Sequence, residues 1–220
     1  PITGRQNLSF HRLHVKGPRK LGISIDPWRH LKEFLDSTGG KPLDIAICIG
    51  LPPAIEVGGA SKVPYDEIEM AGALIGEPIE LVKCDHVNIQ VPTCTEILVE
   101  GSNIPVLEEE GPFAEFTGYY ASGVTPAMVV RVKAVLYRNH PILWGEPPLK
   151  PAVQCGLPIP AAAVWENLEK AGISDVTGVW QLLDRMPTVI SVKQRYDGHA
   201  MRAGLVAATL PGSGYITRFI

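Results

Sequence analysis

Residues that alternate with a period of two constrain this chain most, because they predict a β-sheet. The clearest run extends from Met128 to Tyr137, and within residues 130–135 the apolar Val130, Val132 and Ala134 are separated by the charged Arg131 and Lys133. Such alternation buries one face of a strand and exposes the other. Further β-rich runs extend from Asp44 to Ile49, from Ile79 to Val82 and from Thr95 to Glu100. We therefore expect a half-buried sheet or barrel.

Two helical patterns interrupt these runs. Asp26 is suited to cap a helix and Pro27 to begin it. The apolar face of this helix is expected to consist of Trp28, Leu31, Phe34 and Leu35. A second helix is expected from Tyr65 to Ile75. The first part of the chain therefore fits a barrel with helical insertions.

A stretch rich in Pro and Gly, residues 144–151, predicts a linker to a second unit. The second unit is expected to contain a helix from Ala161 to Ala171 ended by Gly172, a strand from Thr188 to Lys193, a helix from His199 to Leu210 and a strand from Tyr215 to Ile220. This βαβ-like order predicts an α/β layer. We expect two domains, residues 1–150 and 151–220.

Composition narrows the class of protein. The 220 residues are 45% hydrophobic, which is ample for a core, and the formal net charge of -3 with scattered Lys and Arg argues against nucleic-acid binding. No apolar run is long enough to span a membrane, and residues 1–5 lack the apolar core that is typical of a signal peptide. Four cysteines without CxxC spacing suggest buried free thiols and a cytoplasmic location. The missing initial Met and the strand-like end lead us to expect a fragment.

Two acids on either side of a Gly-Pro turn form the most unusual local motif. Glu110 and Glu115 are separated by Gly111, Pro112, Phe113 and Ala114, so they do not share a helical face. Two carboxyl groups in different surroundings titrate at different pH, which suits acid/base chemistry. The acids at 108–110 could instead be a solvated turn, and the aromatic residues that follow could be core.

Several polar residues are weak signals when taken alone. Residues 7–15 alternate like a strand, which places Asn7, Ser9 and His11 on one face and Arg12 on the other. His11, His14 and His30 are as compatible with structural roles as with binding, and Glu67 lies near an expected helix start. Residues 58–61 form a small-residue turn that would admit a flat ligand, although the turn lacks P-loop or GxGxxG spacing.

The segment EGPFAEFTGYY, residues 110–120, resembles the signature of the UbiD family of prenylated-FMN-dependent (de)carboxylases. The usual signature has Gly where this chain has Ala114. Other segments that resemble the family are VPTCTEILVEG (91–101), VKCDHVNIQVP (82–92), GALIGEP (72–78), the G-x-PP turn at 50–53, and Asn7 followed by Arg12. The resemblance extends from Asn7 to about Pro151, and residues 191–207 resemble the start of the family's C-terminal domain.

The resemblance implies a fold and an acid/base network. The expected fold is a split β-barrel flavin-binding domain with helical insertions, followed by part of an α/β domain, hence α+β or α/β overall. The family's catalytic residues correspond to Arg12, Glu110 and Glu115. In this assignment Glu115 donates a proton to the substrate carbon, and Arg12 pairs with Glu110.

The resemblance also implies cofactor sites. Prenylated FMN would be bound by residues at Asn7, Ser9, His11, Arg12, Arg29, Gly59, Ala60 and Glu67. Its phosphate would be held through Mn2+ or Mg2+ with Asn7, His30 and Glu67 as ligands, and K+ is a further candidate cation. An amide oxygen, an imidazole and a carboxylate suit such an ion better than a closed zinc site.

These expectations favour a reversible, non-oxidative decarboxylase of an α,β-unsaturated or (hetero)aromatic carboxylic acid. The expected partner is a small carboxylic acid, and the full-length protein is expected to form a homo-oligomer. Two alternatives remain open: a partial flavin-binding or assembly fragment of such an enzyme, and an FMN-dependent split-barrel oxidoreductase. Hydride transfer has no need of two acids, which argues against the oxidoreductase.

Overall fold

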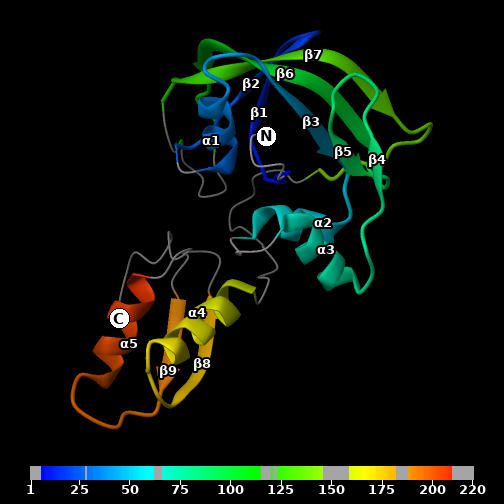
Figure 1. The fold of residues 1–220 in the computed structure, drawn as a ribbon. Helices are drawn as coiled ribbons and strands as arrows, with labels where there is room; N and C mark the ends of the chain where they lie inside the picture. Colours follow the sequence, from blue (N-terminus) through cyan, green and yellow to red (C-terminus); the bar gives the residue numbers. More distant parts are fainter. Residues whose placement is uncertain are drawn as a thin grey trace. The chain divides into compact units, whose positions relative to one another are not determined.

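The computed structural model describes residues 6–27, 29–61, 66–114, 120, 123–145, 159–181 and 188–209. The chain divides into two compact units. The first unit contains every element from β1 to β7, and the second contains every element from α4 to α5 (Figure 1). Both units contain helices and strands, so the protein is of mixed α and β class.

A five-stranded antiparallel sheet forms the centre of the first unit, in the order β1-β2-β7-β6-β3. Its strands are β1 (Leu13–Gly17), β2 (Lys20–Ile23), β3 (Leu43–Ile49), β6 (Ile97–Glu110) and β7 (Thr125–Tyr137). The runs predicted at 44–49, 95–100 and 128–137 are confirmed as β3, β6 and β7. Within the described residues the strands do not close into a barrel, and β1 and β3 are the edges.

Three helices and a small hairpin complete the first unit. The helices are α1 (His30–Ser37), α2 (Pro53–Ala60) and α3 (Glu67–Ile75), and the hairpin consists of β4 (Leu81–Lys83) and β5 (Gln90–Pro92). Leu31 of α1 packs on the sheet against Ile23, Ile45 and Val130. Helices α2 and α3 lie side by side (Figure 1), and Ile55 and Ala71 form their shared core.

Local sequence explains where α3 begins and ends. The Asp66 carboxylate accepts hydrogen bonds from the backbone N–H groups of Ile68 and Glu69, at 2.8 and 3.2 Å. These bonds satisfy donors that have no partner inside a helix. The helix ends at Gly76, which has a φ of 90°. The helix predicted from residue 65 to 75 is therefore confirmed from Glu67 onward, and Tyr65 lies outside the described residues.

Two predictions for the first unit are wrong in detail. The first helix was expected to be capped by Asp26 and to begin at Pro27, but α1 begins at His30, after Arg29. Asp26 is instead part of a turn in which its carbonyl accepts the Arg29 N–H, and its side chain caps no N–H of α1. Trp28 lies outside the described residues. Residues 7–12 are not a strand, and β1 begins only at Leu13.

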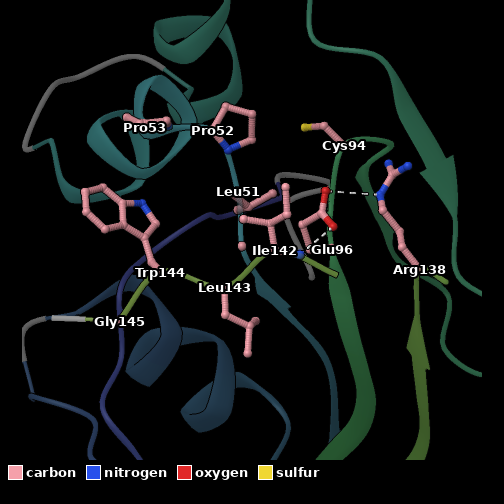
Figure 2. A pocket seen from close by; sticks show the side chains of 11 residues that line it. Leu51, Pro52, Pro53, Cys94, Glu96, Arg138, Ile142, Leu143, Trp144 and Gly145 are labelled. Atoms are coloured by element: carbon pink, nitrogen blue, oxygen red, sulfur yellow. Dashed lines mark hydrogen bonds and ion pairs between the residues drawn. The ribbon is translucent and has the colours of Figure 1, made fainter. Parts of the chain in front are cut away.

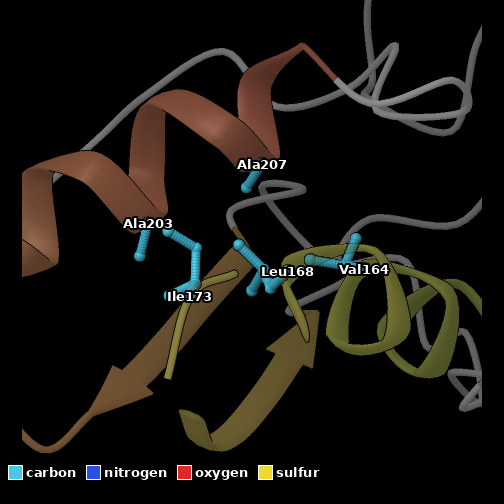
Figure 3. Packing of buried hydrophobic residues seen from close by; sticks show 5 residues of the cluster. All are labelled: Val164, Leu168, Ile173, Ala203 and Ala207. Atoms are coloured by element: carbon cyan, nitrogen blue, oxygen red, sulfur yellow. The ribbon is translucent and has the colours of Figure 1, made fainter. Parts of the chain in front are cut away.

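The second unit is built on an antiparallel pair of strands. Its elements are α4 (Ile159–Lys170), β8 (Val176–Gln181), β9 (Thr188–Val192) and α5 (His199–Ala208). Leu168 of α4 and Ala203 and Ala207 of α5 form its core with Ile173 (Figure 3). The helices at 161–171 and 199–210 and the strand at 188–193 are confirmed within a few residues.

The predicted βαβ order is not present in the described part of this unit. Strand β8 was missed because Gly178 interrupts its pattern, and β8 pairs antiparallel with β9. The strand expected at 215–220 lies outside the described residues. No helix among the described residues has the length and apolarity required to cross a membrane.

The prediction of buried free thiols is confirmed for Cys84, whereas Cys48 and Cys94 are only partly buried. Cys48, Cys84 and Cys94 are free thiols. Burial, followed by the nearby charge of Glu100, raises the pKa of the Cys84 thiol to about 11. A thiol with a raised pKa is a poor nucleophile, so Cys84 has a packing role. Cys155 lies outside the described residues.

Candidate functional site

Arg12 and Glu110 form an ion pair in the first unit. Arg12 precedes β1 and Glu110 ends β6, and Arg12 Nη2 donates to Glu110 Oε2 at 2.8 Å. Strands β2 and β7 lie between β1 and β6 in the sheet, so the sheet must curl to bring these side chains together. The Glu110 side chain is fully buried, and the described residues offer its Oε1 no hydrogen-bond partner. A buried carboxylate with one unused oxygen is an unusual arrangement and indicates a site.

Phe113 connects this pair to a neighbouring histidine. The guanidinium carbon of Arg12 lies 4.8 Å from the centre of the Phe113 ring, within the range of a cation–π interaction. The His14 ring meets the same ring edge-on, with 5.3 Å between ring centres. Arg12 and His14 therefore hold the residue that follows the Gly-Pro turn, in which Gly111 has a φ of 82°.

Lys16, the next alternate residue of β1, also reaches this segment and donates to the carbonyl of Glu109. Arg12, just before β1, and His14 and Lys16, within it, thus all contact residues 109–113. Glu115, the second acid of the predicted network, lies outside the described residues. Ala114 is described and exposed.

A second cluster brings together Asn7, His30 and Glu67. His30 Nδ1 lies 2.9 Å from Asn7 Oδ1 and 3.9 Å from Glu67 Oε1. His30 is the first residue of α1 and Glu67 the first of α3. The described residues contain no group of three His, Cys, Asp or Glu side chains that could hold a metal ion. The cluster of Asn7, His30 and Glu67 is not such a group, because Asn7 contributes an amide.

Leu8 explains why Asn7 is held at this place. Its side chain packs against the core of α2 and α3, and its N–H donates to Glu67 Oε2 at 3.4 Å. The residue beside Asn7 is therefore anchored on the helix that carries Glu67.

The predicted turn at Gly59 and Ala60 is wrong, because both residues belong to α2. The prediction overlooked that Pro53 is compatible with the first position of a helix. The glycines permit close packing: a Cβ on Gly58 would lie 2.6 Å from the Glu67 carbonyl oxygen, and one on Gly59 would lie 3.2 Å from Leu8 Cγ. Gly58 and Gly59 thus allow α2 to approach the segments that carry Asn7 and Glu67.

Ser9, His11 and Arg29, which were also expected at the flavin, lie beside the second cluster. Ser9 and His11 are linked to Asn7 by hydrogen bonds, and Arg29 precedes His30 in the sequence. Asn7 Nδ2 donates to Ser9 Oγ at 3.1 Å, and Ser9 Oγ lies 2.9 Å from His11 Nε2. His11 Nδ1 lies 3.2 Å from the Ser24 carbonyl oxygen. Burial is the largest influence on His11 and lowers its pKa. Arg29 lies 3.8 Å from the carboxylate of Asp26.

Sequence reasoning missed a second buried carboxylate, Glu100. Its side chain is fully buried, and its two oxygens accept the backbone N–H groups of Asp85 and His86. A Glu within a β-rich run gave no signal that distinguished it from an exposed strand residue. Glu100 fixes the turn between β4 and β5.

An open hollow of about 600 Å³ lies elsewhere in the first unit. Figure 2 shows Trp144 and Arg138 at opposite ends of this hollow, with Pro52 and Leu143 between them. Arg138 is paired there with Glu96, at 3.4 Å. Among the residues that the structure describes, none of those predicted for the flavin, the metal or catalysis lines it.

Comparisons with known proteins identify the family of this chain. The sequence model of the UbiD family, described as the 3-octaprenyl-4-hydroxybenzoate carboxy-lyase Rift-related domain, matches residues 1–151. The chain is 33% identical to a phenolic acid decarboxylase of Bacillus subtilis (strain 168), over 96% of this chain and 47% of that protein. It is 36% identical to a phenolic acid decarboxylase of Escherichia coli O157:H7, over 99% of this chain and 47% of that protein.

Solved structures give the same result. An evolved dimeric form of the UbiD-class enzyme HmfF from Pelotomaculum thermopropionicum, in complex with prFMN, matches 98% of this chain with a TM-score of 0.85 and 35% identity, over 51% of that chain. The 3,4-dihydroxybenzoic acid decarboxylase AroY of Klebsiella pneumoniae matches 91% of this chain with a TM-score of 0.76 and 30% identity, over 46% of that chain. The chain thus spans about half the length of the curated relatives it matches. With a family match across most of its length, the chain belongs to the UbiD family.

Proposed function

We propose that this chain provides the flavin-binding part of a prenylated-FMN-dependent carboxy-lyase, which removes or adds a carboxyl group non-oxidatively. The observation that carries the proposal is the buried ion pair of Arg12 and Glu110 at the start of the acid turn. The substrates we propose are aromatic acids, and phenolic acids above all, because the relatives in Bacillus subtilis and Escherichia coli are phenolic acid decarboxylases. Other α,β-unsaturated or heteroaromatic acids belong to the same chemical class.

The roles of the three charged residues follow from charge and burial. Prenylated FMN, when bound, supplies the electron sink that no side chain offers during loss of CO2. Glu115 is assigned the proton that the substrate carbon needs afterwards. The Arg12 guanidinium carries several N–H donors in a fixed planar arrangement. It therefore donates to Glu110 and at the same time orients an anionic group of the flavin or substrate. Oε1 of buried Glu110, which has no hydrogen-bond partner among the described residues, fits a site that is completed by a bound molecule.

Asn7, His30 and Glu67 fit a divalent cation. They bring an amide oxygen, an imidazole nitrogen and a carboxylate together, with His30 Nδ1 2.9 Å from Asn7 Oδ1 and 3.9 Å from Glu67 Oε1. We propose that they hold Mn2+ or Mg2+, which would in turn hold the cofactor phosphate. Ser9, His11, Arg29 and the α2 residues Gly59 and Ala60 are proposed to border the flavin, and K+ is proposed as a further cation.

The rest of the proposal concerns the whole protein. We place the domain boundary near residue 150, so that residues 1–150 bind flavin and residues 151–220 begin an α/β domain. The protein is proposed to act in the cytoplasm, where thiols such as Cys48, Cys84 and Cys94 stay reduced. A homo-oligomer is proposed for the full-length protein.

The test is a decarboxylation assay with a defined cofactor. The protein is supplied with prenylated FMN and Mn2+, and CO2 release is measured over a panel of phenolic, cinnamic, furan and aliphatic acids. We expect release from at least one aromatic acid and its loss in Glu115→Gln. Normal release by Glu115→Gln would contradict the proton-donor assignment. Flavin binding without any turnover would instead support the alternative of a partial flavin-binding unit.

A further inference from the structure

We infer that Ser9 and His11 position Asn7 as a metal ligand. They form a chain of hydrogen bonds that fixes which end of the Asn7 amide faces the proposed ion. The inference rests on the metal site proposed above and gives Ser9 and His11 a role in addition to bordering the flavin. Residues that hydrogen-bond to a metal ligand in this way hold the ligand in its binding orientation.

The direction of the chain is set by the backbone carbonyl of Ser24. This oxygen lies 3.2 Å from His11 Nδ1. A carbonyl only accepts, so His11 Nδ1 carries the hydrogen, and the neutral ring offers Nε2 as an acceptor. Burial, the largest influence, lowers the pKa of His11, which favours the neutral ring.

Ser9 passes this direction to Asn7. Its Oγ lies 2.9 Å from His11 Nε2, and a serine hydroxyl has one hydrogen to give. Because Nε2 has no hydrogen, the Ser9 hydroxyl must donate to it. Ser9 Oγ then accepts from the other side, where the Asn7 amide nitrogen lies at 3.1 Å.

The Asn7 amide therefore has one favoured orientation. With its nitrogen bound to Ser9, its Oδ1 points at His30, 2.9 Å from Nδ1. An inverted amide would place Oδ1 against a hydroxyl whose only hydrogen is already used. It would also turn an NH2 group, which does not bind cations, toward His30.

The backbone keeps the chain of bonds in place on both sides. Leu8 is anchored between Asn7 and Ser9 by its packing and by its N–H donation to Glu67 Oε2, at 3.4 Å. His11 is fixed by the carbonyl of Ser24. Ser9 therefore lies between two anchored points and does not need to be ordered when an ion binds.

The test measures Mn2+ affinity by electron paramagnetic resonance, in the presence of saturating FMN and independently of turnover. We expect Ser9→Ala to weaken Mn2+ binding by roughly 10- to 100-fold, the usual cost of losing a residue that hydrogen-bonds to a metal ligand. Ser9→Thr keeps the hydroxyl and should bind Mn2+ within a few-fold of the unaltered protein. His11→Ala should weaken binding like Ser9→Ala, with the fold of each variant checked by circular dichroism.

Repeating the Ser9→Ala substitution in an Asn7→Asp protein separates an effect on the orientation of residue 7 from an effect on packing. In Asn7→Asp the two carboxylate oxygens are equivalent, so rotation of the group removes no ligand. Adding Ser9→Ala to Asn7→Asp should therefore weaken Mn2+ binding far less than Ser9→Ala alone. An unchanged affinity in Ser9→Ala, or an equal loss in both backgrounds, would overturn the inference. If the unaltered protein binds no Mn2+, the proposed metal site fails and the inference fails with it, so the two failures are distinguishable.

Discussion

The guanidinium of Arg12 lies 2.8 Å from the carboxylate of Glu110, although the two residues are separated by 98 positions and by two strands of the sheet. The Glu110 side chain is fully buried and the Arg12 side chain is 38% exposed. Burial of a carboxylate has a large desolvation cost, which the Arg12 charge offsets. The fold therefore depends on this pair, in addition to any role that the pair has in chemistry.

Arg12→Ala should destabilise the protein because it leaves Glu110 buried without its cation. We expect the free energy of unfolding to fall by about 1–3 kcal/mol, a moderate value because solvent screens part of Arg12. Lys20→Ala is the matched control: Lys20 Nζ also lies 2.8 Å from a glutamate of β6, Glu108, but both side chains are partly exposed. The control should lose less than about 1 kcal/mol in urea denaturation. Equal losses would show that burial of Glu110 has no special cost.

Phe113→Leu should impair turnover more than folding. Leucine fills much of the space but has no π face for Arg12 and no ring edge for His14, so the acid turn is less well held. We expect a stability loss of about 1 kcal/mol and a fall in kcat of about tenfold or more, since small misplacements of reacting groups are costly. Phe113→Tyr retains the ring and is the control. Full kcat in Phe113→Leu would contradict a positioning role for the ring.

Periodicity was sufficient for the elements whose burial alternates. Strand β7 was predictable because its exposed and less exposed residues largely alternate, whereas β3 and β6 were predictable from their β-rich runs, since residues 99–103 of β6 are all buried. Helix α2 was not predictable, because Pro52, Pro53, Gly58 and Gly59 are typical of turns. In the structure Pro53 begins the helix, which its fixed φ permits, and the glycines admit close neighbours, which is an effect of tertiary packing.

The candidate site shows the same limit. No local pattern relates Arg12 to Glu110, and only the family resemblance suggested that they meet. The strand-like alternation placed Asn7, Ser9 and His11 on one side, and these residues are indeed linked by side-chain hydrogen bonds, although residues 7–12 form no strand. The carbonyl of Ser24 could not be anticipated, since a backbone acceptor has no signature in sequence.

Acid should destabilise the first unit through His11. Burial lowers the pKa of His11 below its ordinary value of 6.5. Between the folded pKa and 6.5 the unfolded chain binds more protons than the folded chain, so the free energy of unfolding rises with pH in this window. The contribution is fully present above pH 6.5 and is lost as the pH falls through the folded pKa. Urea denaturation across this range should give a smaller slope for His11→Gln, and an unchanged slope would assign the acid sensitivity to other groups.

Gly58→Ala should damage both stability and the proposed metal site. The added Cβ would lie 2.6 Å from the backbone oxygen of Glu67, so α2 and α3 must move apart. Overpacking of this kind costs about 1–3 kcal/mol, and the displaced backbone carries a proposed ligand, so Mn2+ affinity should fall as well. Gly17→Ala is the control, because a Cβ there meets nothing within 4 Å, and it should change stability by less than about 0.5 kcal/mol. If Gly58→Ala lost stability but kept full Mn2+ affinity, the prediction would be contradicted. The packing of α2 against the backbone of Glu67 would then have no influence on the proposed metal site.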